Sequence, residues 1–173
     1  MGQPKALLRL VDGRTLLRAW LDALALVAPL RLVVVGAVVE RLVALLRPGE
    51  RAVQNPDWAR TGPAESLHLA ALALPEDTPW ALVTPVDVPP CGADDLRALC
   101  AAETPAVLSY GGLPGHPVRL GPNELRALRR APPIGGLHTL LTGATRIPSA
   151  QPDTLLNLNT PQDLDAWRRG DLR

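Results

Sequence analysis

The chain has 173 residues, 47% of them hydrophobic, and a formal net charge of +1. A chain of this length buries enough apolar surface to fold without staples, so we expect one globular domain over residues 1–173. The near-neutral charge and the aromatic content of 3% exclude the basic footprint and the stacking surface of nucleic-acid-binding proteins. No nucleic-acid partner is therefore expected.

Neither a membrane span nor a disulfide framework is predicted. The longest apolar run, residues 32–39, is much shorter than the roughly 20 residues that a transmembrane helix needs. Charged residues among the first leucines leave no apolar core for a signal peptide. Cys91 and Cys100 have no zinc-binding or disulfide pattern and are expected to be buried, reduced thiols. We expect a cytoplasmic protein with no membrane partner.

Strand and helix patterns alternate along the chain. In chain order, hydrophobic spacing first predicts a helix over residues 15–28, a strand over 31–36 and helices over 37–46 and 63–74. A strand over 80–84, a helix over 93–102 and a strand over 105–110 follow. The last predicted elements are a helix over 122–130, a strand over 154–159 and a helix over 160–169. The first strand is expected to be buried on both faces. The last helix should begin with Thr160 as its N-cap and Pro161 at its first position.

This alternation predicts an α/β fold of three layers, in which helices cover both faces of an open, mostly parallel sheet. Ligands of such folds bind beyond the carboxyl ends of the strands. The stretch "PVDVPP" places Asp87 in a proline-stiffened loop at that edge. A rigid carboxylate there suits Mg²⁺, which shares its octahedral shell with substrate phosphates. The alternative is a carboxylate that only caps a helix or stabilises a turn.

Polar residues at other loops have two interpretations each. Asn157 and Asn159 should share one face of the strand over 154–159, where they could complete a metal shell, hold a sugar hydroxyl or simply satisfy loop backbone. The glycine-rich "GGLPGHPV" is expected to be a flexible loop that carries Gly115 and His116. His116 could donate to a phosphate, act as a base or serve packing.

The stretch "NPDWARTGPAESL" leads into the helix over 63–74. Free N–H groups at the helix start, with Ser66 in the first turn and Asn55 and Gly62 in the preceding loop, could contact a phosphate or a base. The alternative is an ordinary capped helix, which explains the same residues.

In this order, the motifs resemble the nucleotidyltransferase family that includes the molybdenum-cofactor guanylyl- and cytidylyltransferases. "MGQPKALL" matches the second half of that family's phosphate loop, and "TPVDVPP" is similar to its metal loop. "NPDWARTGPAESL", "GHPVRL" and "PIGGLHTLL" resemble its middle segments, and "NLNTPQDLDAW" resembles its asparagine-rich ending. The middle motifs are closer to the cytidylyl members and the last motif to the guanylyl members.

The resemblance implies a Mg²⁺-dependent transfer of a nucleoside monophosphate from GTP or CTP to a phosphorylated acceptor such as molybdopterin, with release of pyrophosphate. It implies these roles: catalysis by Lys5 and Asp87; nucleotide binding by Gly2, Lys5, Asn55, Gly62 and Ser66; acceptor binding by Gly115 and His116; and metal binding by Asp87, Asn157 and Asn159. The implied partners are the NTP and the small acceptor, with a molybdoenzyme or a second copy of the chain as candidate protein partners.

The family's first strand and the first half of its phosphate loop have no counterpart in this sequence. We expect the natural protein to begin upstream of Met1 and to be an ordinary nucleotidyltransferase, truncated here relative to the family. The alternative is a degenerate, non-catalytic protein that still binds a nucleotide or a cofactor.

Overall fold

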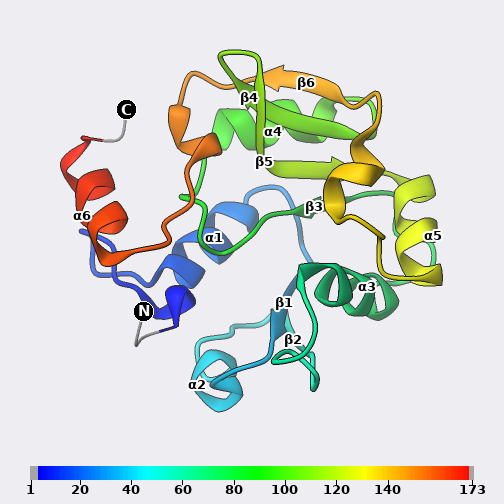
Figure 1. The fold of residues 1–173 in the computed structure, drawn as a ribbon, viewed down its shortest axis with the longest axis horizontal. Coiled ribbons are helices and arrows are strands. Elements are labelled where there is room, and N and C mark those ends of the chain that lie inside the picture. Colours follow the sequence, from blue (N-terminus) through cyan, green and yellow to red (C-terminus); the bar gives the residue numbers. More distant parts are fainter. Residues whose placement is uncertain (1–3, 172–173) are drawn as a thin grey trace.

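The structure, a computed structural model, describes residues 4–171 and has an α/β fold (Figure 1). Its α-helices are α1 (Leu16–Leu24), α2 (Val39–Val43), α3 (Pro63–Ala73), α4 (Ala93–Ala101), α5 (Pro122–Arg130) and α6 (Pro161–Arg169). Its strands are β1 (Arg31–Val35), β2 (Glu50–Gln54), β3 (Ala81–Val83), β4 (Ala106–Tyr110), β5 (Leu113–Leu120) and β6 (Thr145–Pro148). Three short 3₁₀ turns are η1 (Lys5–Leu7), η2 (Leu137–Leu141) and η3 (Pro152–Leu155).

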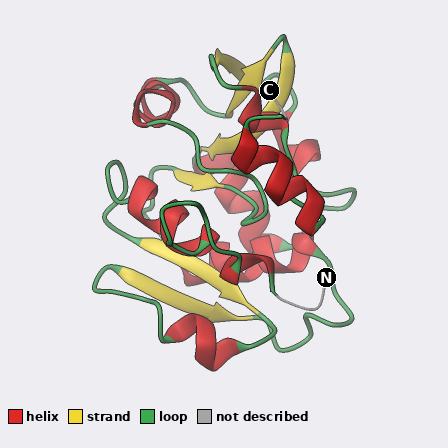
Figure 2. Ribbon diagram, turned by 90° about the vertical axis from the view of Figure 1, so that its left-hand side faces the viewer, coloured by secondary structure: helices red, strands yellow, loops and turns green. Residues whose placement is uncertain are grey.

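The described strands form two sheets. β1 and β2 pair in parallel, and the second sheet has the order β3-β5-β4-β6. Within it β6 is parallel to β4, whereas β5 is antiparallel to both β3 and β4. Figures 1 and 2 show the β1–β2 pair at one end of the molecule and β6 at the other. The α/β class is confirmed. The expected single, mostly parallel sheet is not found, because the described strands form two sheets and β5 is antiparallel to both of its neighbours.

The antiparallel direction of β5 comes from a tight turn after β4. Gly111 and Gly112 have φ values of 56° and 82°, and they join Tyr110 to its partner Leu113. Two successive residues with positive φ make a hairpin turn whose twist suits the strands, and glycine adopts this conformation without strain. The expectation of a flexible loop at "GGLPGHPV", residues 111–118, is therefore wrong, since Leu113 onward is strand.

Helices cover both faces of the four-stranded sheet, as predicted. Ala106 and Leu108 pack in one core with α4 and with Trp20 of α1. Val107, the residue between them, belongs to a second core with α5 and with Ala71 of α3. Successive residues of a strand point to opposite faces, so β4 supplies both cores. This is the three-layer arrangement that the alternation of elements predicted.

Helix α1 also packs against the β1–β2 sheet. Its Leu17 and Leu21 are buried with Val35 of β1, while Trp20 is buried with Val88 on the side of the other sheet. Thr15 begins the helix, and its side chain accepts a hydrogen bond from the Arg18 backbone N–H at 3.1 Å. One short amphipathic helix therefore contributes to the cores beside both sheets.

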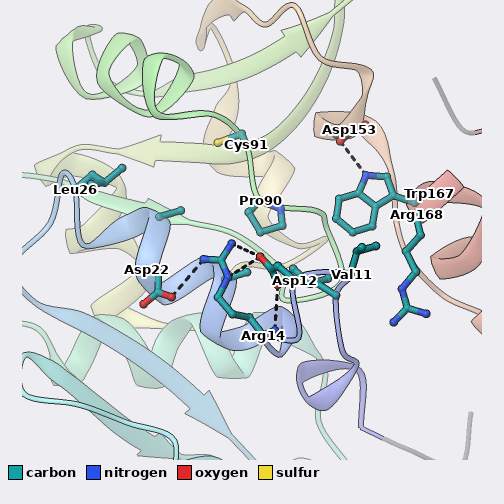
Figure 3. Close-up of a pocket in the computed structure, with 13 residues that line it drawn as sticks. Val11, Asp12, Arg14, Asp22, Leu26, Pro90, Cys91, Asp153, Trp167 and Arg168 are labelled. Atoms are coloured by element: carbon teal, nitrogen blue, oxygen red, sulfur yellow. Dashed lines mark hydrogen bonds and ion pairs between the residues drawn. The ribbon is translucent and has the colours of Figure 1, made fainter. Parts of the chain in front are cut away.

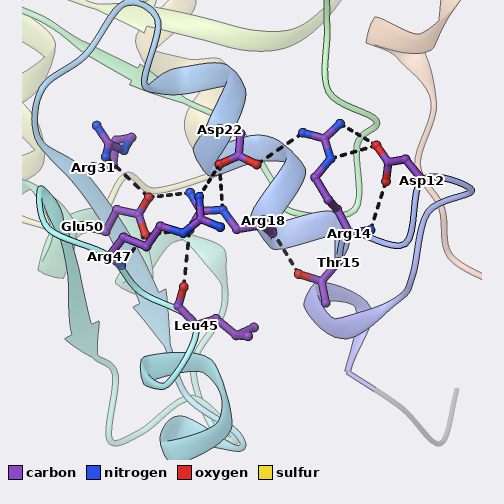
Figure 4. Close-up of polar contacts among 9 residues, drawn as sticks. All are labelled: Asp12, Arg14, Thr15, Arg18, Asp22, Arg31, Leu45, Arg47 and Glu50. Atoms are coloured by element: carbon purple, nitrogen blue, oxygen red, sulfur yellow. Dashed lines mark hydrogen bonds and ion pairs between the residues drawn. The ribbon is translucent and has the colours of Figure 1, made fainter.

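A buried ion pair strengthens the contact between α1 and β2 (Figure 4). The Arg18 guanidinium contacts both carboxylate oxygens of Glu50, at 2.9 and 2.5 Å, and the Glu50 side chain is only 1% exposed. Arg18 also donates to Asp22, and the backbone N–H of Arg47 donates to Glu50. These hydrogen bonds, that from Arg18 foremost, lower the pKa of the Glu50 carboxyl to about 2.

Two elements of the first half are smaller or less buried than predicted. The helix expected over 37–46 is limited to Val39–Val43, and Val38 before it has a positive φ of 49°. Only Val35 of β1 is fully buried, whereas the rest of the strand is half-buried. The expectation of a strand buried on both faces is therefore wrong, because residues 31–34, which point alternately to the two faces, all keep part of their surface exposed.

Among residues 4–171, none of the helices has the length and apolar character needed to cross a bilayer.

Candidate functional site

Lys5 lies in the short turn η1, which is anchored by backbone hydrogen bonds and by a buried leucine. The backbone N–H groups of Leu7 and Leu8 donate to the carbonyls of Pro4 and Lys5, and Leu7 is buried with Leu17 and Val35. The Lys5 side chain extends away from this anchor. Its Nζ donates to Asp87 Oδ2 and to Asn159 Oδ1, each at 2.7 Å.

Asp87 follows β3 in a loop that is held by its backbone. The Asp87 carbonyl accepts a hydrogen bond from the Leu158 N–H at 2.8 Å, and the next carbonyl, that of Val88, accepts one from Trp20 Nε1 at 2.6 Å. Val88 itself is fully buried. The carboxylate of Asp87 therefore has a fixed position beyond the carboxyl end of a strand, as the sequence predicted.

The strand predicted over 154–159 does not form. Residues 152–155 make the turn η3, and the chain continues as a loop to α6. Leu158 is fully buried in a core with Leu16 and Leu164, and its N–H bonds to the Asp87 loop rather than to a strand. Of the three leucines in the segment that suggested a strand, only Leu158 is fully buried.

Asn159 and Asn157 have different environments. The backbone N–H groups of Asn159 and Thr160 both donate to Asp163 Oδ2, at 2.9 and 2.7 Å, and Asp163 N–H donates to Thr160 Oγ1. The bonds from Thr160 lower the pKa of the exposed Asp163 carboxyl. The predicted cap at Thr160 is therefore confirmed, and it orients Asn159 toward Lys5. Asn157 is exposed two residues earlier in the same loop.

His116 is on β5 near Asp87. Its Nδ1 is buried and has no hydrogen-bond partner among the described residues. Burial lowers the pKa of the His116 imidazole, while the negative charge of Asp87 and a backbone hydrogen bond at Val83 oppose this shift. His116 therefore has a neutral imidazole with a buried, unsatisfied nitrogen, and this nitrogen can bind a polar ligand group.

Gly115 precedes His116 at a close backbone contact. A Cβ built on Gly115 would lie 2.3 Å from the carbonyl oxygen of Thr154 in η3. Only a glycine lets β5 approach η3 this closely, because any Cβ at that distance would clash. The glycine thus allows β5 to pack directly against η3, the turn that precedes the Asn159 loop.

Asn55, Gly62 and Ser66 form a second group. Asn55 is buried, and its Nδ2 donates to Thr61 Oγ1 at 3.1 Å and to Ser66 Oγ at 3.3 Å. Its Oδ1 accepts from the Asp57 N–H. The Asn55 amide therefore stabilises the loop before α3, which agrees with the interpretation of this segment as an ordinary capped helix. Gly62 is the N-cap of α3, with open space around its Cα.

Among residues 4–171, no hydrogen bond or ion pair joins this second group to Lys5, Asp87 or Asn159. The structure therefore brings Lys5, Asp87 and Asn159 together but not the whole predicted set. Gly2 lies outside the described residues.

A separate cavity lies away from these residues (Figure 3). It has a volume of about 710 Å³ and lies between α1, the Pro90–Cys91 segment and α6. Its carboxylates already have partners: Asp12 and Asp22 contact Arg14 at 2.6 and 3.3 Å, and Asp153 accepts from Trp167 Nε1 at 2.9 Å. We place the candidate site at Lys5, Asp87 and Asn159 instead, because these residues come from three distant segments of the chain and their polar groups converge.

The oxygen donors at this site fit a divalent cation that is shared with a substrate. The Lys5 ammonium stands where two hard oxygens, a carboxylate and an amide, converge. Among residues 4–171, no group of three His, Cys, Asp or Glu side chains surrounds a candidate metal position. One carboxylate with few other protein ligands is the donor set that Mg²⁺ uses when phosphates and water complete its shell.

The chain matches a model of a known family, described as a MobA-like NTP transferase domain, over residues 1–151. A search of curated proteins finds no match.

Several solved structures are similar. A homologue of Mycobacterium tuberculosis Rv0371c from Mycobacterium sp. strain JC1 has 23% identity and a TM-score of 0.77, with 98% of this chain and 89% of that chain covered. Rv0371c from M. tuberculosis H37Rv, solved as a complex with manganese, has 20% identity and a TM-score of 0.74, with coverages of 97% and 91%. Molybdopterin-guanine dinucleotide biosynthesis protein A from Archaeoglobus fulgidus has 18% identity and a TM-score of 0.64, with coverages of 98% and 91%. At these identities the likeness establishes a shared fold.

Proposed function

Because the chain belongs to the family of MobA-like NTP transferase domains, we propose that it transfers a nucleoside monophosphate from GTP or CTP to a small phosphorylated acceptor. Molybdopterin is the proposed acceptor, since a protein of molybdopterin-guanine dinucleotide biosynthesis has the same fold. The observation that supports this proposal best is the convergence of Lys5, Asp87 and Asn159, which are far apart in the sequence.

In the proposed reaction, a phosphate oxygen of the acceptor attacks the α-phosphorus of the NTP. A bond forms between that oxygen and the α-phosphorus, and the bond to the bridging oxygen of pyrophosphate breaks. The nucleophile is already anionic, so the protein has to position the two phosphates and offset their charge. Pyrophosphate leaves with the electron pair of the broken bond.

Each residue of the site then has a defined task. Lys5 would offset negative charge on the triphosphate, and Asp87 and Asn159 would hold the divalent cation. When bound, that cation would neutralise phosphate charge and orient the phosphates for in-line displacement. The manganese complex of Rv0371c supports a divalent ion of this kind in the same fold. We propose Mg²⁺ as the ion, with Asn157 as a further oxygen donor in the same loop.

His116 is proposed to bind the acceptor. Because burial lowers its pKa, the imidazole is neutral near pH 7 and contributes a hydrogen bond rather than a charge. Gly115, which permits the close approach of β5 to η3, is proposed to contribute to the same acceptor site. On the nucleotide side, Asn55 and Ser66 order the loop that leads to Gly62 and the start of α3, where the base is proposed to bind.

The test is release of pyrophosphate from GTP or CTP in the presence of Mg²⁺ and molybdopterin. We expect the Asp87→Asn variant to lose at least about a hundredfold in rate, because removal of a charge-stabilising group commonly costs that much. Asp94→Asn is the matched control, since Asp94 is a fully exposed carboxylate on α4. Nucleotide binding without any turnover would contradict the proposal and favour the non-catalytic alternative.

A further inference from the structure

The Lys5 ammonium occupies the position at which the two proposed metal ligands converge. Nζ is 2.7 Å from Asp87 Oδ2 and 2.7 Å from Asn159 Oδ1. These are short, charge-assisted hydrogen bonds. The Lys5 and Asp87 side chains are 32% and 21% exposed, so the ion pair is open to solvent on one side.

A divalent ion on these oxygens would need the same space. Oxygen ligands lie about 2.1 Å from Mg²⁺, on the side of the oxygen where its lone pairs point. The ammonium already lies on that side of both Asp87 Oδ2 and Asn159 Oδ1. Two cations held by one pair of oxygens would also repel each other strongly at such a separation.

We propose that Lys5 is the resident cation of the site and that a divalent ion displaces it, so that metal binding releases the lysine toward the substrate phosphates. The release of Lys5 toward substrate phosphates rests on the proposed function. The exchange of Lys5 for a divalent ion requires only Lys5, Asp87 and Asn159. Without metal, Lys5 keeps the Asp87 carboxylate paired.

The surroundings of Lys5 allow its side chain to move without unfolding the site. Its backbone is fixed by η1 and by the burial of Leu7. The four-carbon stem of lysine is flexible, and the ammonium is partly exposed. The ligands are held independently of Lys5, since Leu158 N–H bonds to the Asp87 carbonyl and Asp163 accepts from Asn159 N–H. Departure of the ammonium therefore leaves both oxygens in place.

The sequence offers a direct probe, because Lys5 is the only lysine in the chain. Protein labelled with ¹³C,¹⁵N-lysine gives a single set of side-chain NMR signals, and Mg²⁺ is diamagnetic. We expect the Lys5 Cε and Nζ signals to be those of a hydrogen-bonded ammonium without metal. Titration with MgCl₂ alone, with no nucleotide, should move them to the values of a free lysine side chain. Calorimetry on the same samples measures the binding of Mg²⁺.

Variants separate displacement from a general charge effect. Lys5→Met should bind Mg²⁺ about two- to fivefold more tightly, because it removes a competing ion pair that is partly exposed. Arg97→Ala removes one positive charge from the exposed face of α4 and should leave the affinity unchanged. Asp87→Asn should move the Lys5 signals toward those of a free lysine before any Mg²⁺ is added, because only the bond to Asn159 remains, and these signals should not respond to Mg²⁺.

Two results would overturn the inference. One is binding of Mg²⁺ with unchanged Lys5 signals, which would place the ion elsewhere, for example on the other oxygen of Asp87. The second is the absence of any Mg²⁺ binding at millimolar concentrations. Neither readout depends on turnover, so a protein that exchanges Lys5 for Mg²⁺ but transfers no nucleotide would contradict the proposed function and leave this inference standing.

Discussion

At the scale of single residues, backbone contacts determine where the side chains of the candidate site lie. The Asp87 carbonyl is bound by Leu158, and the Asn159 N–H is bound by Asp163. The side-chain oxygens are thus positioned by bonds that do not involve the oxygens themselves. This leaves the oxygens available to a cation, either the Lys5 ammonium or a metal ion.

Gly115→Ala should destabilise the protein because the new Cβ would meet the Thr154 carbonyl at 2.3 Å. We expect a loss of about 1–3 kcal/mol in the free energy of unfolding, which is typical of overpacking. Urea denaturation followed by circular dichroism measures it. Gly92→Ala is the control, since a Cβ at Gly92 would have no atom within 4 Å. Equal midpoints for the two variants would show that β5 and η3 can separate without cost.

Cys91 should react with thiol reagents only after unfolding. Burial raises the pKa of its thiol to about 12, with a further contribution from the charge of Asp95. The thiolate is the reactive form, so at pH 8 the folded protein holds Cys91 protonated as well as inaccessible. Cys100 is only half-buried and should react faster. Mass spectrometry after a pulse of iodoacetamide measures both, and rapid labelling of native Cys91 would contradict its burial.

At the scale of elements, the ion pair between Arg18 of α1 and Glu50 of β2 stabilises the contact of a helix with a sheet. Glu50→Gln should cost about 3 kcal/mol at pH 7, because it leaves the buried Arg18 charge without its partner. Glu40→Gln is the matched control, since Glu40 is exposed on α2. Thermal or urea unfolding of the two variants measures the difference.

The same carboxyl makes stability depend on pH. The pKa of Glu50 falls from 4.5 to about 2 on folding, so its stabilising contribution is complete above pH 4.5 and is lost as the pH falls toward 2. The wild-type protein should therefore lose more stability over this interval than Glu50→Gln does. Parallel pH profiles for the two proteins would exclude Glu50 as the source of the loss.

Elements with strong local signals could be predicted from the sequence. The last helix begins at Thr160 and Pro161 as expected, because capping is decided by neighbouring residues. Strand β5 escapes prediction because Pro114 and Pro117 argue against a strand, although "GG" after β4 is a hairpin signal. The segment 154–159 differs from its prediction because a short stretch with one fully buried leucine fits a loop as well as a strand.

At the scale of the whole molecule, the candidate site depends on contacts that local patterns cannot predict. The Lys5 to Asp87 bond joins residues 82 positions apart, and the Lys5 to Asn159 bond joins residues 154 positions apart. Periodicity identifies Asp87 as lying at a strand end, but only the resemblance to a family suggested its meeting with Lys5. For Asn55 the resemblance suggested nucleotide binding, whereas the fold uses the Asn55 side chain to order a loop.

The two sheets should unfold together, because α1 contributes to the cores beside both of them. Trp20 is 2% exposed and donates to the Val88 carbonyl, while Leu17 and Leu21 of the same helix pack with β1. A helix this short is not stable alone, so weakening one of its contacts weakens the other. Trp20→Phe should cost about 2 kcal/mol through the lost hydrogen bond and the cavity.

Hydrogen exchange measures whether this loss is shared. Amides of β1 and of β4 should lose the same free energy of protection in Trp20→Phe, since one cooperative unit opens as a whole. Trp58→Phe should change neither, because Trp58 is 51% exposed. If only the β4 amides lost protection, the β1–β2 pair would be a separate unit. The position of Lys5, which is anchored on the β1 side through Leu7, would then vary independently of Asp87, and the site would not be preorganised.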